Sequence, residues 1–67
     1  MKIYSICTIS ESGDYYLYHV QSEDKPNNKQ IERFLIDFGN DRDVDEDYTY
    51  EHVLNVLELK TEGIITI

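Results

Sequence analysis

Three side chains in the sequence have the chemistry of an acid–base or nucleophilic site, namely His19, His52 and Cys7. A histidine titrates near neutral pH, and a cysteine thiolate is a nucleophile. If residues 2–9 and 15–20 are paired strands, Cys7 and His19 lie in neighbouring strands, where facing residues are about 5 Å apart. A catalytic cysteine needs exposure and a lowered pKa, however, and no serine stands in a nucleophile-elbow context. We therefore expect structural roles for all three residues and no enzymatic activity.

The acidic run NDRDVDED, residues 40–47, is the other candidate for chemistry, because alternating carboxylates are typical of calcium loops. The sixth position of such a loop needs glycine and is Glu46, and the twelfth needs a bidentate glutamate and is His52. A calcium loop that begins at Asp43 instead of Asp41 matches the required residues less well. The sequence therefore predicts no dedicated metal site and no cofactor.

A third interpretation of these residues is a protein-binding surface built from tyrosines and carboxylates. Six tyrosines are many for 67 residues, and a small core cannot easily hide them all, because each buried hydroxyl needs a partner. Exposed tyrosine supplies contact area at low entropic cost, and nearby carboxylates steer a basic partner. The residues assigned to this surface are Asp41, Asp43, Asp45, Glu46, Asp47, Tyr48, Tyr50, Tyr15, Tyr16, Tyr18 and Tyr4. The alternative is that the tyrosines are half-buried core and the acidic run only keeps the protein in solution.

The spacing of the aspartates indicates what such a surface would bind. Residues two apart in an extended chain are separated by about 6.8 Å, or about two nucleotide rises along one strand. The aspartates of residues 41–47 would then imitate a phosphate backbone and occupy a basic nucleic-acid site of another protein. The same negative charge repels nucleic acid and anionic membranes, so neither is expected as a direct partner.

The elements that position these residues begin with a β-hairpin. β-Branched and aromatic residues predict strands over residues 2–9 and 15–20, and Gly13 in the turn between them takes a positive φ at no steric cost. Both faces of this hairpin carry apolar or aromatic groups, whereas a two-layer domain normally leaves one face polar. The sheet is therefore expected either to be covered on both faces or to expose an apolar, aromatic face.

An amphipathic helix is predicted by apolar residues at i, i+3, i+4 and i+7, which are Ile31, Phe34, Leu35 and Phe38. Asn27 is the expected N-cap, with Gln30 completing a capping box, and Gly39 suits the C′ position after the last turn.

The region after this helix is ambiguous. Residues 40–47 have no core pattern and are expected to form an exposed loop. The spacing of apolar residues from Tyr50 to Leu57 favours a second helix, and the alternative is a strand over residues 56–60. Residues 64–67 are short and β-branched and predict a final strand beside the hairpin. The order β-β-α-(α or β)-β indicates an α+β fold, with a small antiparallel sheet packed against one or two helices.

Length, charge and composition indicate the number of domains and the location of the protein in the cell. The 67 residues make a single domain, residues 1–67, in which no ligand-sized pocket of about 300 Å³ or more is expected. Fourteen acidic and six basic residues give a net charge of −8. A single cysteine, no export signal in the first ten residues and no run of about 20 apolar residues together favour a cytoplasmic protein.

No motif in the sequence assigns the chain to a family. In size, acidity and lack of catalytic residues it resembles a loose class of small inhibitors made by phages and mobile elements, including anti-CRISPR proteins and other antagonists of DNA-handling enzymes. This resemblance implies a non-enzymatic inhibitor or decoy that occupies a basic surface of a nucleic-acid-handling protein. The alternative is a homodimeric structural or assembly subunit that buries the second face of the sheet.

Overall fold

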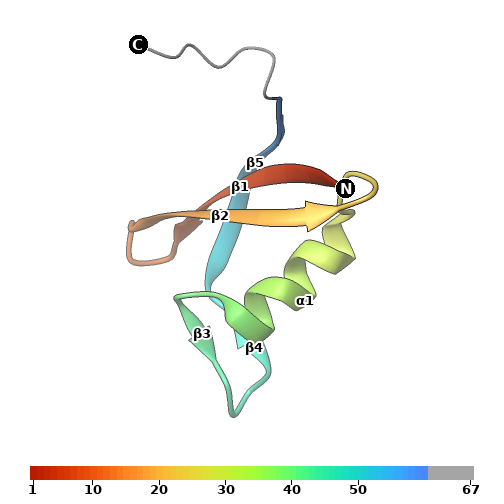
Figure 1. The fold of residues 1–67 in the computed structure, drawn as a ribbon. Coiled ribbons are helices and arrows are strands. Elements are labelled where there is room, and N and C mark those ends of the chain that lie inside the picture. The colour runs from red at the N-terminus through yellow and green to blue at the C-terminus, as the bar shows by residue number, and fades with distance from the viewer. Residues whose placement is uncertain (61–67) are drawn as a thin grey trace.

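A computed structural model describes residues 1–60 of the chain, which form an α+β fold (Figure 1). In chain order the elements are β1 (Lys2–Ser10), β2 (Tyr15–Ser22), α1 (Asn28–Phe38), β3 (Arg42–Asp43), β4 (Tyr48–Thr49) and β5 (Glu51–Leu59). The predicted α+β class with a small antiparallel sheet is confirmed, whereas the strand expected at residues 64–67 lies outside the described residues.

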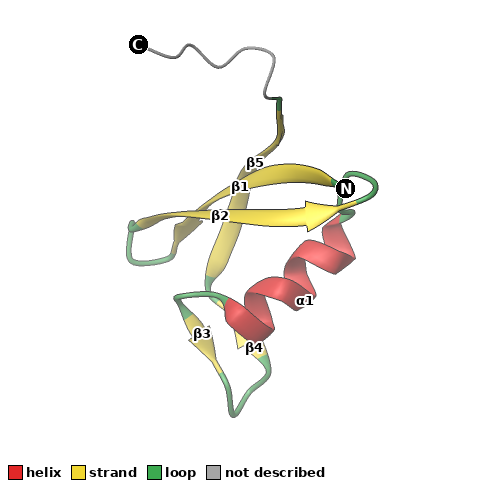
Figure 2. Ribbon diagram, in the orientation of Figure 1, coloured by secondary structure: helices red, strands yellow, loops and turns green. Residues whose placement is uncertain are grey.

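The main sheet has β1 at its centre, antiparallel to β2 on one side and to β5 on the other. β1 and β2 form the predicted hairpin, and Gly13 in their turn has a φ of 90°, as expected. The strand that docks beside this hairpin is β5, which Figure 2 shows running across β1. A small second sheet pairs β3 with β4.

The helix α1 covers one face of the sheet (Figure 2). The core cluster joins Ile6 of β1 to two helix residues, Ile31 and Leu35, and the half-buried side chains packed around it are Tyr18, Val20, Phe34 and Val56. The expected capping box is present. The Gln30 backbone N–H donates to the Asn27 side-chain oxygen, and the Asn27 backbone N–H donates to the Gln30 side-chain oxygen, each at 2.9 Å.

One residue of the predicted helical stripe is not in the core. Phe38 is 70% exposed, because it is the last residue of α1 and lies a turn beyond the contacts that Phe34 and Leu35 make with the sheet. Its ring packs instead against Phe34, with the ring centroids 5.7 Å apart.

The helix favoured over residues 50–57 is wrong, because Glu51–Leu59 is strand β5. The pairing of β5 with β1 shifts between Cys7 and Thr8, whose partners are Asn55 and Val53, so Leu54 is an extra residue that forms a β-bulge. A bulge shifts the alternation of side chains by one residue. Val53 and Val56 therefore share the helix-facing side although they are three residues apart, a spacing that is typical of a helix.

The opposite side of the sheet, here called the outer face, is not covered within residues 1–60. It exposes large apolar and aromatic side chains, which are Ile3, Tyr15, Leu17, Leu57 and Leu59. Of the two outcomes expected for the sheet, residues 1–60 show the exposed face. Within the same residues, no helix has the length and apolar character needed to span a membrane.

Candidate functional site

The predicted acidic residues lie in a second hairpin, here called the acidic hairpin, which comprises residues 41–49 with β3, a turn and β4. Figure 1 shows it at the end of α1 remote from the loop that joins β2 to α1. In the turn, Asp43 Oδ1 accepts the backbone N–H groups of Asp45 at 3.1 Å and Glu46 at 3.2 Å. The chain reverses direction over residues 44–47, so the extended row of aspartates that we expected is wrong, and the phosphate-like spacing is not kept.

An ion-pair bridge fixes the acidic hairpin to the helix. The Arg33 guanidinium binds Asp47 through two hydrogen bonds of 2.8 and 2.9 Å and also binds Asp37 one turn along α1. These hydrogen bonds lower the pKa of both carboxyls below the ordinary aspartate value. They also raise the pKa of Arg33, with the larger effect from the bond to Asp37 and the smaller from the bond to Asp47. Asp47 is thus locally neutralised, whereas Asp43, Asp45 and Glu46 contact no cation within residues 1–60.

The bridge predicts a pH-dependent contribution to stability. Because the folded pKa values of Asp37 and Asp47 are lowered, the contribution is complete above about pH 4 and is lost as the pH falls through the folded pKa values. We expect Arg33→Gln to lower the melting temperature at neutral pH and the difference from the parent to shrink below pH ~4. Lys29→Gln removes a helix cation that contacts no carboxylate within residues 1–60 and is the control. A difference between Arg33→Gln and the parent that stays constant from neutral to acid pH would contradict the assignment.

Two tyrosines stand beside the acidic hairpin. The rings of Tyr48 and Tyr50 pack edge to face, with centroids 5.0 Å apart. Partial burial, followed by the charge of Asp43 and that of Glu11, raises the pKa of Tyr50, so its hydroxyl lies among carboxylates. Tyr16 lies opposite Thr8 across the first hairpin, and the Thr8 hydroxyl donates to Glu51, which also binds the Asp41 N–H. Burial and then the charges of Asp14 and Asp41 raise the pKa of Tyr16. The hairpin acids therefore share one region with Tyr16, Tyr48 and Tyr50.

Of the other three tyrosines, only Tyr18 reaches this region, through its hydroxyl, which accepts the backbone N–H of Asn40. Tyr15 lies on the outer face, because it pairs with Ile9 across the hairpin, and it is 68% exposed. Tyr4 is only 3% exposed, because it lies on the helix-facing side of the central strand, so its ring is not available to a partner. Tyr18 is half-buried on the same side, where burial and then its hydrogen bond to Glu51 raise its pKa.

The most distinctive polar group in the described residues is the Glu51 carboxylate, which is 4% exposed and was not predicted from the sequence. Its Oε1 accepts hydrogen bonds from the hydroxyls of Thr8 at 2.5 Å and Tyr18 at 2.7 Å, and its Oε2 accepts the Asp41 backbone N–H at 3.0 Å. The Tyr18 hydroxyl in turn accepts the backbone and side-chain N–H groups of Asn40. No cation pairs with Glu51 within residues 1–60, so three neutral donors alone stabilise its charge.

The residues considered for nucleophilic chemistry do not form a facing pair. The hairpin register places Leu17 opposite Cys7 and Ser5 opposite His19, so Cys7 and His19 are diagonal neighbours on the outer face. His52 lies in β5 and approaches Glu11 at 3.9 Å instead.

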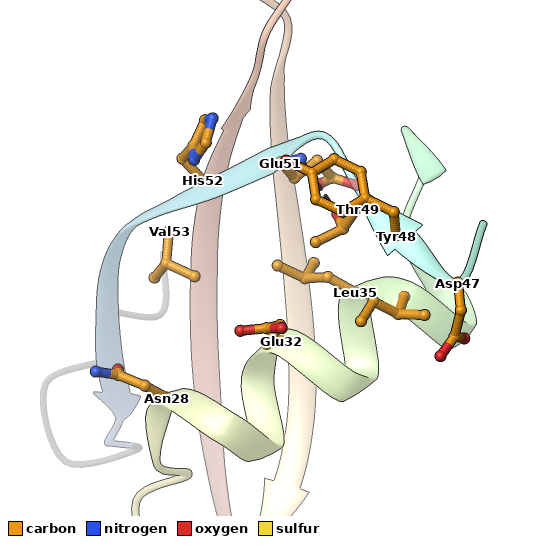
Figure 3. A pocket seen from close by; sticks show the side chains of 10 residues that line it. Asn28, Glu32, Leu35, Asp47, Tyr48, Thr49, Glu51, His52 and Val53 are labelled. Atoms are coloured by element: carbon orange, nitrogen blue, oxygen red, sulfur yellow. Dashed lines mark hydrogen bonds between the residues drawn. The ribbon is translucent and has the colours of Figure 1, made fainter. Parts of the chain in front are cut away.

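A hollow of about 520 Å³ lies between α1 and the segment formed by β4 and β5 (Figure 3). No local pattern in the sequence predicts this hollow, and its volume of about 520 Å³ is larger than we expected for so short a chain. Figure 3 shows Glu32 and Val53 pointing into this space from the helix and the strand. Val56 of β5 packs on the core around Ile6, whereas Val53, on the other side of the bulge, is exposed and lines the hollow.

Comparisons with protein-family models, with curated proteins and with solved structures found no match to this chain.

Proposed function

We propose that this protein is a non-enzymatic binding module that docks its acidic hairpin onto a basic surface of another protein and so acts as an inhibitor or decoy. The observation that carries the proposal is the joint placement of the Tyr48–Tyr50 pair and the carboxylates of Asp43, Asp45 and Glu46. Tyrosine rings anchor an interface, while surrounding carboxylates raise the association rate with a basic partner.

The rigidity of the acidic hairpin also supports this proposal. The hairpin is joined to α1 through Arg33 and to the sheet through backbone hydrogen bonds from Tyr50 N–H to Asp41 C=O, 2.9 Å, and from Glu11 N–H to Tyr50 C=O, 3.1 Å. A surface that is already ordered loses little conformational entropy when it binds. A basic nucleic-acid site is a surface that such a module would block, since it is lined with lysine and arginine.

The charge of the hairpin turn is tested by a matched pair of double variants. Asp45→Asn with Glu46→Gln is expected to slow association with a short arginine-rich peptide about threefold at low salt, because two steering charges are removed. Glu23→Gln with Asp24→Asn makes the same change in net charge in the exposed loop before α1 and should have little effect. Association rates are measured by stopped-flow fluorescence at several salt concentrations.

The comparison of these two variants decides whether the site is local. Equal slowing in both would assign the effect to net charge and would overturn the proposal. An unchanged rate in the hairpin variant would remove the hairpin from the mechanism.

A second candidate function is a homodimeric structural or assembly subunit, and the outer face favours it. Leu17 and Leu57 are 62% and 59% exposed there, on the two edge strands, and Ile3 and Leu59 are adjacent across β1 and β5. An apolar sheet face of this kind is typical of a surface covered by another chain. A second copy would cover it with the same residues, as a twofold interface requires.

Sedimentation velocity at micromolar concentration tests this second function. We expect the parent chain to sediment as a dimer and Leu17→Lys with Leu57→Lys to sediment as a monomer, since both side chains are exposed in the single chain. Val44→Lys places a lysine on an exposed apolar residue of the acidic hairpin and should remain dimeric. A monomeric parent at all concentrations would exclude the homodimer.

A further inference from the structure

The hollow between α1 and β5 has an unbalanced negative charge. Glu32 and Glu51 both line it, and neither forms an ion pair within residues 1–60. Asp47 also lines it, but its charge is balanced by Arg33. Since no lysine or arginine lines the hollow, a cation entering it would meet the free carboxylate of Glu32. Glu51, whose oxygens already accept three hydrogen bonds, adds negative charge that no cation balances within residues 1–60.

The remaining walls suit a long side chain with an apolar stem. Val53 of β5 and the half-buried Ile36 of the helix contribute aliphatic surface, and the buried Leu35 lies between the hollow and the core. Tyr48 adds an aromatic ring at the hairpin end of the hollow. An arginine or lysine side chain buries its methylene stem against apolar surface while its charged end contacts carboxylates and aromatic faces.

We propose that this hollow receives an arginine side chain of the partner protein, which makes it the specificity pocket of the binding surface described above. The inference rests on the proposed function, because Asp47 and Tyr48 belong both to the acidic hairpin and to the lining of the hollow. A partner that docks on the hairpin is therefore adjacent to the pocket. Arginine is favoured over lysine because its planar guanidinium stacks on an aromatic ring and binds carboxylates in a bidentate manner.

The pocket is tested with small probes that fit inside it and do not span the hairpin turn. The full chain, labelled with ¹⁵N, is titrated with N-acetyl-arginine amide and with N-acetyl-citrulline amide, which has nearly the same shape without the charge. We expect saturable shifts at the amides of Glu32 and Val53 with the arginine probe, and affinity about fivefold lower for the citrulline probe. N-acetyl-lysine amide is expected to bind more weakly than the arginine probe.

Matched variants separate the pocket from the general charge of the protein. Glu32→Gln is expected to weaken the arginine probe about threefold, and Glu23→Gln, with the same charge change in the exposed loop before α1, is expected to leave its affinity unchanged. Both residues are exposed, so both variants keep the fold.

Three outcomes would overturn the inference. These are equal affinity for the arginine and citrulline probes, equal weakening by Glu32→Gln and Glu23→Gln, or shifts from the arginine probe that do not include the pocket. The arginine-rich peptide, titrated against Asp45→Asn with Glu46→Gln in the same assay, reports on the proposed function separately. If the peptide depends on the hairpin acids while the small probe misses the pocket, the pocket fails and the proposed function stands. If neither probe binds, both fail.

Discussion

Replacing Glu51 with alanine is expected to lower the free energy of unfolding by about 3 kcal/mol, because buried donors that lose their acceptor each cost about 1–3 kcal/mol. The carboxylate accepts hydrogen bonds from Thr8, Tyr18 and the Asp41 backbone, and these join β1, β2 and the acidic hairpin. A domain of this size has a total stability near the low end of about 5–15 kcal/mol. The variant is therefore expected to lose a large part of its stability, as measured by urea denaturation.

Two further variants identify the cause of this loss. Glu58→Ala removes another β5 carboxylate that is exposed and is expected to change stability by less than about 0.5 kcal/mol. Glu51→Gln keeps one acceptor oxygen but presents an amide N–H₂ to the same donors, so we expect a loss between those of the two alanine variants. If Glu51→Ala were no more harmful than Glu58→Ala, the carboxylate would not organise the hairpin as described.

The features that sequence reasoning predicted correctly depend on residues close together in the chain. The capping box of α1 needs only Asn27 and Gln30, and the turn of the first hairpin needs only a glycine where φ is positive. Both signals lie within a few residues, so they are visible without knowledge of the fold.

β5 was misassigned because a tertiary feature changed a local pattern. An uninterrupted strand places every second residue on one face, and Val53 and Val56 do not fit that period. The bulge at Leu54 restores both to the helix-facing side, and it is defined only by the pairing of β5 with β1. Helical and bulged-strand patterns are therefore not distinguished by spacing alone in this segment.

The candidate site was predicted only in part, because only some of its residues are close together in the sequence. The acids and Tyr48 and Tyr50 are close in sequence, and their proximity in the fold follows from one hairpin. Glu51 looked like another surface acid, because its hydroxyl partners Thr8 and Tyr18 are 43 and 33 residues away. The hollow likewise depends on how α1 packs across the sheet, which no single segment specifies.

The second large effect is expected at Gly39, where alanine should lower the free energy of unfolding by about 2–3 kcal/mol through overpacking. Gly39 was expected to occupy a left-handed C′ position, but its φ of −63° is open to any residue, so conformational freedom is not the reason for glycine here. A Cβ on Gly39 would lie 2.4 Å from the Leu35 carbonyl oxygen and 2.7 Å from Glu51 Oε2. One of these neighbours belongs to the helix backbone and the other to the buried carboxylate network, so neither moves freely.

Gly13→Ala separates steric from conformational costs, because its φ of 90° disfavours alanine but no atom lies within 4 Å of the new Cβ. We expect a loss of about 1 kcal/mol there, smaller than at Gly39. A double-mutant cycle between Gly39→Ala and Glu51→Ala then tests the contact itself: removal of the carboxylate relieves one of the two clashes, so the combined loss should be smaller than the sum. Strict additivity would mean that the helix carbonyl alone excludes a side chain at position 39, and that the close approach of Glu51 contributes nothing to the choice of glycine.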